Sequence, residues 1–297
     1  MMKQCFATLV LAGLVFAGVA QAPMSKSTMA VAPISNSKPL NMTHQEKIHQ
    51  LLAAVNAADP EAARSVLDPD YRQHNLLIPD KAAGLLSLFP LIREQGLKVQ
   101  TVRLLVDGDL VVAHNFWTNA QLLGAPEVVS FDVFRIGADG KIAEHWDALM
   151  PNTPPNPSGR SLTSGSNQVT DREATDRNKA TVQKLFHTII KGSQAEVGAV
   201  VQEHFRPDYH QHTPSAADGI EAVFAAFARE QWVYHRQHRV IGEGNFVLSI
   251  SEGTAQGVPS VFYDLLRFEE GKIVEHWDVI QAIPTENLAN GNTMFGF

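Results

Sequence analysis

The octapeptide Gly-Lys-Ile-Ala-Glu-His-Trp-Asp at residues 140–147 returns as Gly-Lys-Ile-Val-Glu-His-Trp-Asp at residues 271–278. Upstream of it, Tyr-Arg-Gln-His at residues 71–74 returns as Tyr-His-Gln-His at residues 209–212. The two motifs keep the same order and a similar separation in both occurrences. A match of this length indicates a tandem duplication, so we expect the chain to fold as two similar units.

The order of the predicted elements within each copy indicates an α+β fold. Thr43 and Glu46 form a capping box that predicts a first helix, and Asp59-Pro60 predicts the start of a second. A third helix is expected over residues 82–94 and, in the second copy, 220–230. The expected strands are residues 98–105, 110–119, 128–136 and 142–150, and then 234–241, 246–252, 260–268 and 273–280. Helices followed by an antiparallel meander are typical of α+β domains.

The composition is that of a globular protein and excludes several classes of partner. Of the 297 residues, 24 are Lys or Arg and 31 are Asp or Glu, which gives a formal net charge of −7. Such a chain has no basic surface for nucleic acids or for anionic membranes. The only cysteine is Cys5, so an intrachain disulfide, a thiolate metal site and a cysteine nucleophile paired with histidine are excluded.

The first 22 residues predict a secretory signal peptide. Lys3 precedes an apolar run at residues 6–20, and small residues lie just before Pro23. The alternative is an uncleaved membrane anchor, although the run is short for a bilayer. We therefore expect a periplasmic or secreted protein that makes no membrane contact after the signal peptide (residues 1–22) is cleaved.

Composition also predicts the domain boundaries. Residues 23–42 are rich in Ser, Pro and Ala and are expected to be a disordered tether. A Pro/Gly/Ser-rich stretch at residues 151–177 predicts a flexible linker. The two copies then occupy residues 43–150 and 178–297.

The final hairpin of each copy is expected to bring an aspartate and a histidine together. One register serves both copies and places Asp132 opposite His145 in the first and Asp264 opposite His276 in the second. It follows from pairing the arginine of one strand with the isoleucine of the octapeptide, Arg135 with Ile142 and Arg267 with Ile273.

Alternation along these strands separates two faces. One face carries the Asp–His pair, an apolar residue and a second aspartate: Asp132, Phe134, His145 and Asp147, and then Asp264, Leu266, His276 and Asp278. The opposite face carries Val133, Arg135, Glu144 and Trp146, and then Arg267, Glu275 and Trp277. A carboxylate beside an imidazole in a pocket is an acid/base pair that works near neutral pH. The alternative is a structural cross-strand pair on a solvent-exposed face.

Three further histidines are candidate binding residues. His74 and His212 follow the second helix, next to Tyr71 and Tyr209, and could close the mouth of the pocket. His114 lies on a strand and has no histidine counterpart in the second copy, so any role belongs to the first copy.

A metal site is not expected. His210 and His212 form a His-x-His pair of a kind that binds metals. The first copy has arginine at the first of these positions, and no third ligand follows from the spacing.

Together these motifs resemble the SnoaL-like branch of the nuclear transport factor 2-like superfamily, which includes polyketide cyclases. The resemblance covers nearly all of residues 43–150 and 178–297, including the tail at 281–295. It implies a tandem pair of cone-shaped α+β barrels, each with a deep pocket between a curved sheet and the helices. It also implies a cofactor-free aldol closure, in which an Asp/His pair moves protons at a carbon next to a carbonyl.

Carried over to this chain, the resemblance assigns the acid/base role to Asp132 with His145 and to Asp264 with His276. The binding candidates are His212, His74, Tyr209, Tyr71, Asp278, Asp147 and His114. The copies depart from the family pattern in different ways. The first has Leu76 where proline is usual, and the second has Thr213 after its histidine and Ile250 where a strand histidine is common. One or both pockets could therefore be inactive.

Two functions remain open. The first is an exported, cofactor-independent lyase, isomerase or aldol cyclase that acts on a small apolar carbonyl compound. The second is a non-catalytic module that binds a small hydrophobic ligand. A polar pocket with an Asp–His contact favours the enzyme, and a pocket filled by Phe134 or Leu266 favours the second function or a structural role.

The outer sheet faces are expected to meet. Trp146 and Trp277 lie on faces that would otherwise be open to water, where large aromatic residues usually mark an interface. We therefore expect a pseudo-dimer within one chain.

Overall fold

The computed structural model describes residues 42–297. The expected signal peptide, residues 1–22, and all but the last residue of the expected tether, 23–42, lie outside the described residues. Among the described helices, none combines the length and the apolar character needed to cross a bilayer.

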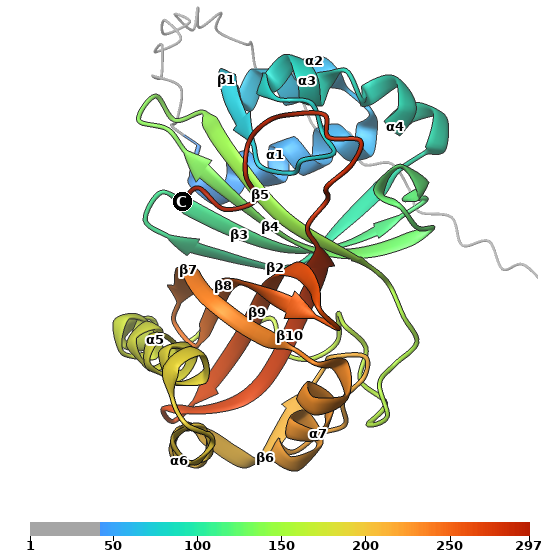
Figure 1. Ribbon diagram of the computed structural model, residues 1–297. Coiled ribbons are helices and arrows are strands. Elements are labelled where there is room, and N and C mark those ends of the chain that lie inside the picture. The colour runs from blue at the N-terminus through green and yellow to red at the C-terminus, as the bar shows by residue number, and fades with distance from the viewer. Residues whose placement is uncertain (1–41) are drawn as a thin grey trace, which may run out of the picture. The chain divides into compact units, whose positions relative to one another are not determined.

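The first copy is a five-stranded mixed sheet with helices on one face (Figure 1). The strand order is β1-β5-β4-β3-β2, in which β1 runs parallel to β5 and the other pairs are antiparallel. The elements are α1 (His44–Ala57), α2 (Pro60–Val66), β1 (Leu67–Gln73), α3 (Lys81–Leu86), α4 (Phe89–Gln95), β2 (Lys98–Asp107), β3 (Leu110–Thr118), the short 3-10 helix η1 (Gln121–Leu123), β4 (Glu127–Ile136) and β5 (Ile142–Pro151).

The second copy repeats this topology with the strand order β6-β10-β9-β8-β7. Its elements are η2 (Arg172–Ala174), α5 (Thr175–Lys191), α6 (Gln194–His204), β6 (Phe205–Gln211), α7 (Ile220–Glu230), β7 (Val233–Glu243), β8 (Phe246–Ala255), β9 (Val258–Glu269) and β10 (Lys272–Ala282). The matching orders confirm the predicted tandem α+β fold.

Local signals in the sequence account for most helix boundaries. The Thr43 hydroxyl accepts from the main-chain N–H of Glu46 (3.3 Å), and the Glu46 carboxylate accepts from the N–H of Thr43 (2.7 Å). Asp59 caps α2 as predicted. The single helix expected over residues 82–94 is wrong, because the structure has two helices there. Pro90 has no N–H and is best accommodated in a first turn, so a new helix, α4, begins beside it.

The final hairpin of the first copy has a different register from the expected one. Asp132 lies opposite Asp147 and Phe134 lies opposite His145, so the predicted pairing of Asp132 with His145 is wrong. Strand β5 carries one extra residue, Ala143, in a bulge, and the turn is displaced by one further position. Two one-residue shifts return every side chain to its predicted face.

The second copy makes the same change. Asp264 lies opposite Asp278 and Leu266 lies opposite His276, with the bulge at Val274. The predicted faces are therefore correct in both copies, although the predicted partners are wrong: Asp264 with His276, Arg135 with Ile142, and Arg267 with Ile273.

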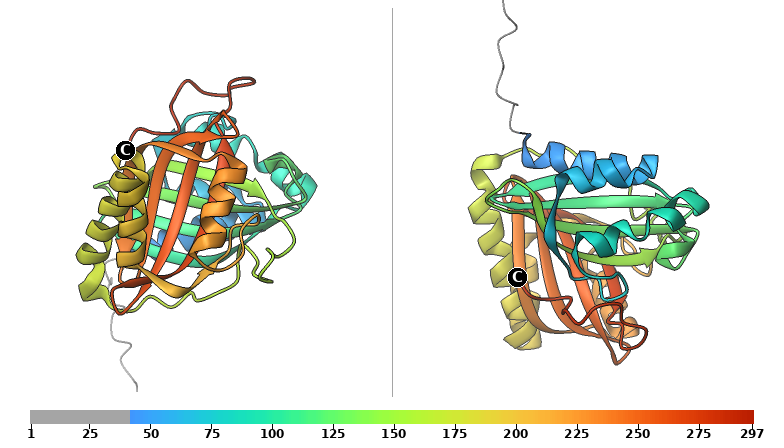
Figure 2. Two further views of the ribbon diagram at one scale, coloured as in Figure 1. Left: turned by 60° about the horizontal axis from the view of Figure 1, so that its bottom comes forward. Right: turned by 90° about the horizontal axis from the view of Figure 1, so that it is seen from above.

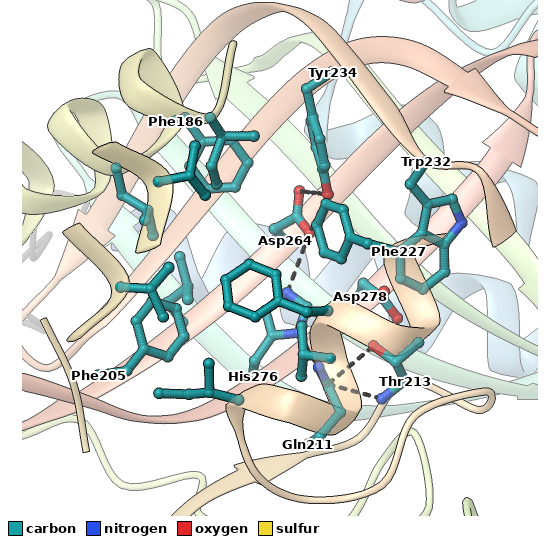
Figure 3. Close-up of a pocket in the computed structure, with 18 of the residues that line it drawn as sticks. Phe186, Phe205, Gln211, Thr213, Phe227, Trp232, Tyr234, Asp264, His276 and Asp278 are labelled. Carbon is teal, nitrogen blue, oxygen red and sulfur yellow. Dashed lines mark hydrogen bonds and ion pairs between the residues drawn. The ribbon is translucent and has the colours of Figure 1, made fainter. Parts of the chain in front are cut away.

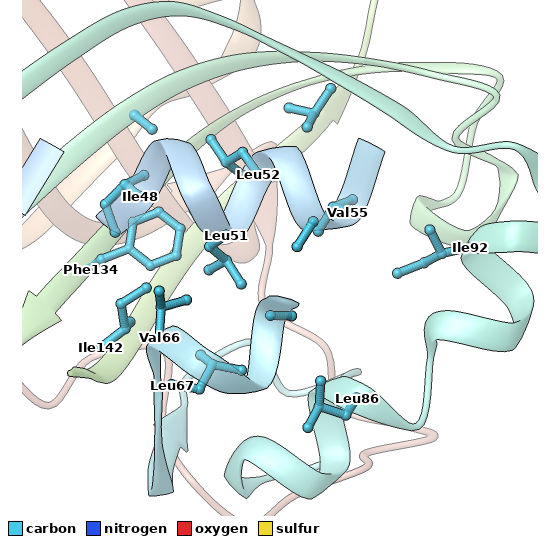
Figure 4. Packing of buried hydrophobic residues seen from close by; sticks show 14 of the residues in the cluster. Ile48, Leu51, Leu52, Val55, Val66, Leu67, Leu86, Ile92, Phe134 and Ile142 are labelled. Atoms are coloured by element: carbon cyan, nitrogen blue, oxygen red, sulfur yellow. The ribbon is translucent and has the colours of Figure 1, made fainter. Parts of the chain in front are cut away.

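Each sheet packs one face on its own helices and the other face on the other sheet (Figure 2). In the first copy, the helix-side core joins the apolar faces of the helices to the sheet (Figure 4). Its members include Ile48, Leu51, Val66, Ile92 and Phe134.

The core between the two sheets contains side chains from both copies. Val133 and Trp146 of the first copy pack in one cluster with Leu265 and Trp277 of the second. Trp146 is 2% exposed and Trp277 is 0% exposed. This confirms the prediction that both indoles lie at the contact between the copies.

The segments that follow β5 and β10 cross to the other copy. Residues 152–171, called the connecting strap below, bury Leu162 and hydrogen-bond to the main chain of the second copy. Residues 283–297, called the C-terminal strap, lie against the first copy (Figure 1), where Phe297 stacks on Trp146 with ring centroids 4.5 Å apart. The connecting strap is thus held by specific contacts, unlike the flexible linker that its composition predicted.

Candidate active site

A cavity of about 430 Å³ lies between the sheet and the helices of the second copy (Figure 3). Its walls are apolar and include Phe186, Phe205, Phe227 and Trp232. Its floor is polar and carries the inward side chains of β9 and β10, namely Asp264, His276 and Asp278. Apolar walls around a few convergent polar groups are typical of small-molecule sites.

His276 lies between an aspartate and a glutamine. Its Nε2 is 3.1 Å from Asp264 Oδ1, and its Nδ1 is 2.9 Å from Gln211 Oε1. The Gln211 amide has one orientation, since its Nε2 donates to the Tyr209 hydroxyl and its Oε1 accepts from the Thr213 N–H, both at 3.0 Å. Nδ1 of His276 therefore donates to Gln211, and Nε2 donates to Asp264 when the imidazole is charged.

Two groups of the floor have raised pKa values. Burial opposes the charged form of His276, but the hydrogen bond to Asp264 and the charges of Asp278 and Asp264 raise the pKa of His276 overall, above its ordinary value of 6.5. Burial raises the pKa of Asp278 from 3.8 to about 6. An imidazolium and a carboxyl group with such pKa values can exchange protons with a bound molecule.

Tyr234 is a polar residue of this site that the sequence analysis missed. Its hydroxyl donates to Asp264 at 3.0 Å from Oδ1 and 3.3 Å from Oδ2, and burial raises the pKa of Tyr234. Opposite it lies Gly253, where a Cβ would come within 3.0 Å of the Phe262 ring and would overlap the Val233 carbonyl. A glycine inside a strand indicates close packing, so Gly253 is the feature of the sequence that pointed to this part of the site.

The first copy has the same polar trio in a cavity of only about 90 Å³. His145 Nε2 is 3.0 Å from Asp132 Oδ1, and His145 Nδ1 is 3.0 Å from Gln73 Oε1. Burial raises the pKa of Asp147 to about 6. Burial opposes the charged form of His145, but the hydrogen bond to Asp132 and the charges of Asp147 and Asp132 together raise the pKa of His145. The directions of these pKa shifts are therefore the same in the two trios, and the space around them differs.

Aromatic side chains occupy that space in the first copy. Phe134 stacks on His145 with ring centroids 4.6 Å apart, at the position of Leu266 in the second copy. Trp117 lines the small cavity and is the eighth residue of β3, as Gly253 is of β8. The first pocket is filled by residues that the second copy lacks.

Tyr71 and Tyr209 line the two cavities, as predicted. His74 does not, because it lies on the opposite face of the sheet, where its Nε2 is 2.9 Å from Glu144 Oε1 and its ring stacks on Trp146. His212 makes the equivalent contacts, with Glu275 Oε1 (2.8 Å) and Trp277. The predicted position of His74 and His212 at the pocket mouth is wrong. The preceding glutamine points inward in each copy, so the next side chain points outward.

His114 is also absent from both cavities, so its prediction as a binding residue is wrong. It stacks on Phe131 in the core between the sheets and accepts a hydrogen bond from Arg103 (2.9 Å). Burial lowers the pKa of His114, which keeps it neutral. On β3 the side chains of the residues on either side of His114 point toward the helices of the first copy, so His114 itself points toward the other sheet.

Each polar trio could also hold a metal ion. Within each trio, the candidate ligand atoms lie within 4.8 Å of one another. A cation at the second trio would have to replace the hydrogen bond between His276 and Asp264. Within the described residues, His210 and His212 belong to no such group. The trios are Asp132, His145 and Asp147, and Asp264, His276 and Asp278.

We expect the folded chain to be more stable near pH 5 than near pH 8, by about 1.4 kcal/mol for each raised carboxyl group. Folding raises the pKa of Asp278 and Asp147 to about 6, so the folded state binds more protons as pH falls through this range. The raised pKa values of His276 and His145 act in the same direction, because their stabilisation is lost as pH rises through the folded-state pKa.

Urea unfolding at the two pH values measures this difference. Asp278→Asn should reduce this difference, because it removes the contribution of Asp278 and leaves those of Asp147 and His145. Equal or greater stability near pH 8 would contradict the assignment. Measurements stay above about pH 4.5, because lowering the pH further also protonates paired glutamates whose pKa values are lowered.

Comparisons with known proteins agree with the repeat. The family model described as SnoaL-like domain matches residues 48–145 and again residues 182–276. No curated protein matches the chain.

Several solved structures are similar to one copy. TsrD from Streptomyces laurentii is 28% identical, with 35% of this chain and 86% of that one covered and a TM-score of 0.31. IdmH, a putative polyketide cyclase from Streptomyces antibioticus, is 21% identical, with 36% and 92% covered and a TM-score of 0.31. A putative polyketide cyclase from Bacillus cereus is 21% identical, with 36% and 73% covered and a TM-score of 0.31.

Proposed function

Because the chain belongs to the family of SnoaL-like domains and carries two copies of the domain, we propose that its second copy is a cofactor-independent acid/base enzyme. The substrate class is a small apolar carbonyl compound, and the reaction is of the lyase, isomerase or aldol cyclase type. The first copy is a structural partner whose pocket is closed.

One observation carries this proposal, namely that the same polar trio lines a large cavity in one copy and a small one in the other. The cavity above Asp264 and His276 measures about 430 Å³, and the cavity above Asp132 and His145 measures about 90 Å³. A substrate must place its reacting carbon within hydrogen-bond reach of the acid/base groups. Only the second cavity has room for one.

The lining of the second cavity supports an uncharged substrate. Among the described residues, no lysine or arginine lines it, and its floor carries two carboxyl groups. A carboxylate or phosphate on the ligand would face Asp264 and Asp278 without a cation to pair with. A neutral carbonyl oxygen can instead accept a hydrogen bond from a protonated group of the floor.

The proposed reaction begins with removal of a proton from the carbon next to the carbonyl. The Asp264 carboxylate accepts this proton, and electron density moves to the carbonyl oxygen to give an enolate. Protonated Asp278, whose pKa is about 6, donates a hydrogen bond to that oxygen. His276 and Tyr234 both contact the Asp264 carboxylate and hold it in place.

Hydrogen exchange tests this function without knowledge of the natural product. Small ketones that raise the melting temperature of the mature chain are incubated with it in deuterated buffer, and NMR follows the loss of their α-hydrogen signals. We expect faster exchange with the protein than with buffer alone. Ketones that bind but exchange no faster would favour the non-catalytic binding module.

We also propose that the mature chain works outside the cytoplasm. The support is the apolar run at residues 6–20, with Lys3 before it and small residues after it. Cell fractionation of the full-length chain should find a shortened protein in the periplasm or the medium. A full-length protein in the membrane fraction would favour the anchor instead.

A further inference from the structure

We propose that the connecting strap, residues 152–171, completes the active site of the second copy, and that Asn156 and Arg160 are positioning residues for His276. They hold the main chain of Gln211, the residue that fixes the imidazole. This inference rests on the proposed function for its catalytic meaning, but its structural content can be tested without a substrate.

Asn156 ties the strap to the second copy through one buried side chain, 5% exposed. Its Nδ2 donates to the carbonyl oxygens of Gln211 (2.6 Å) and Ala216 (2.9 Å). Its Oδ1 accepts from the main-chain N–H groups of Ser158 and Arg160, both at 3.0 Å. The side chain thus closes a loop of the strap and holds the segment after β6 at the same time.

Arg160 holds the same segment from a second direction. Its Nε is 2.8 Å from Asp218 Oδ1, and its Nη2 is 2.8 Å from Asp218 Oδ2. Asp218 Oδ1 in turn accepts from the main-chain N–H of Gln211 (2.9 Å). Both main-chain polar groups of Gln211 are therefore fixed by the strap, the carbonyl directly and the N–H through Asp218.

The position of Gln211 decides the state of His276. The Gln211 Oε1 accepts from His276 Nδ1, which leaves Nε2 of the imidazole facing Asp264. A shift of the Gln211 main chain would release Nδ1 and allow the other tautomer. Misplacement of a catalytic group by about 1 Å can cost about 10²-fold in rate, so this support matters for turnover.

The first copy provides a matched control, because the C-terminal strap does the same for it. Asn290 Nδ2 donates to the carbonyl oxygens of Asn75 (2.8 Å) and Ile78 (2.7 Å), and Asn292 Nδ2 donates to that of Gln73 (2.9 Å). In each copy, the segment around the inward glutamine is thus held by the strap that follows the last strand of the other copy. This exchange makes a selective test possible.

The experiment compares Asn156→Ala and Asn292→Ala by NMR of ¹⁵N-labelled histidine, without a ligand and at one pH. In the unmodified protein, the His276 Nδ1–H gives a protected imidazole signal. We expect Asn156→Ala to remove that signal and leave the His145 signal unchanged. Asn292→Ala, which removes the hydrogen bond to the Gln73 carbonyl, should have the opposite effect, with the His145 signal lost and the His276 signal retained.

Retention of the His276 signal in a folded Asn156→Ala variant would overturn the proposal, and so would loss of both signals in either variant. If Asn156→Ala does not fold, Arg160→Gln tests the same link at a more exposed position and should also remove the His276 signal alone. The signals report the imidazole directly, so they can fail while α-hydrogen exchange persists. That result would contradict the positioning role proposed for the strap and leave the proposed enzymatic function intact.

Discussion

Asp264→Asn should slow the protein-catalysed exchange of α-hydrogens by roughly 10²–10⁴-fold, the usual contribution of a positioned acid/base group. An amide cannot take a proton from carbon. It also replaces one of the acceptor oxygens that face His276 and Tyr234 with a donor. The measurement is the exchange rate by NMR, with circular dichroism to show that the fold is intact.

Asp132→Asn is the matched control, since it makes the same change in the closed pocket. We expect its exchange rate to equal that of the unmodified protein. An unchanged rate in Asp264→Asn would contradict the proposed role of this carboxylate. Slower exchange in Asp132→Asn alone would place the reaction in the first copy and would also contradict the proposal.

Trp277→Ala should lower the free energy of unfolding by about 3–5 kcal/mol, the range for removing a large buried aromatic side chain. The indole Nε1 donates to the Ser164 carbonyl (2.8 Å), the Arg103 guanidinium lies 4.0 Å from the ring centroid, and His212 stacks on it. These partners belong to the connecting strap, the first copy and the second copy. The truncation should therefore also weaken the coupling between the copies.

Calorimetry measures both effects, and we expect two unfolding transitions in place of one. Trp232→Ala is the control, because Trp232 lines the cavity and is absent from the core between the sheets. It should keep a single transition and change ligand binding instead. A loss below about 1 kcal/mol in Trp277→Ala would mean that the contact between the copies contributes little.

The inward-facing groups of the final hairpins could be predicted because a register shift of two residues leaves each side chain on the same face of the sheet. The predicted partner of Asp264 was His276 and the observed one is Asp278, a change of two positions along β10. The bulge that causes half of this change has no signature in the sequence, since Val274 suits either arrangement. His276 still reaches Asp264, but diagonally.

The outer histidines show where repetition of a motif misleads. His74 and His212 recur beside Tyr and Gln, which suggested a binding role. They recur because each forms the same interface contacts with a glutamate and a tryptophan. Each histidine directly follows the inward-facing glutamine on its strand, and this position predicts that the histidine side chain points to the outer face of the sheet.

Tyr234 and the straps could not be predicted because both depend on distant parts of the chain. Tyr234 donates to Asp264, which lies 30 residues away along the chain. Asn156 lies in a stretch whose composition is typical of a linker, and its partners lie 55 and 60 residues away. Neither local propensity nor periodicity carries such information.

The position of a bound ketone in a crystal structure of the protein tests most directly whether the second pocket is the site of chemistry. We predict electron density in the cavity of the second copy, with the carbonyl oxygen within hydrogen-bond distance of Asp278 and the α-carbon beside Asp264. We predict none in the cavity of the first copy. A ketone bound beside Asp132, or bound only outside both cavities, would contradict the account.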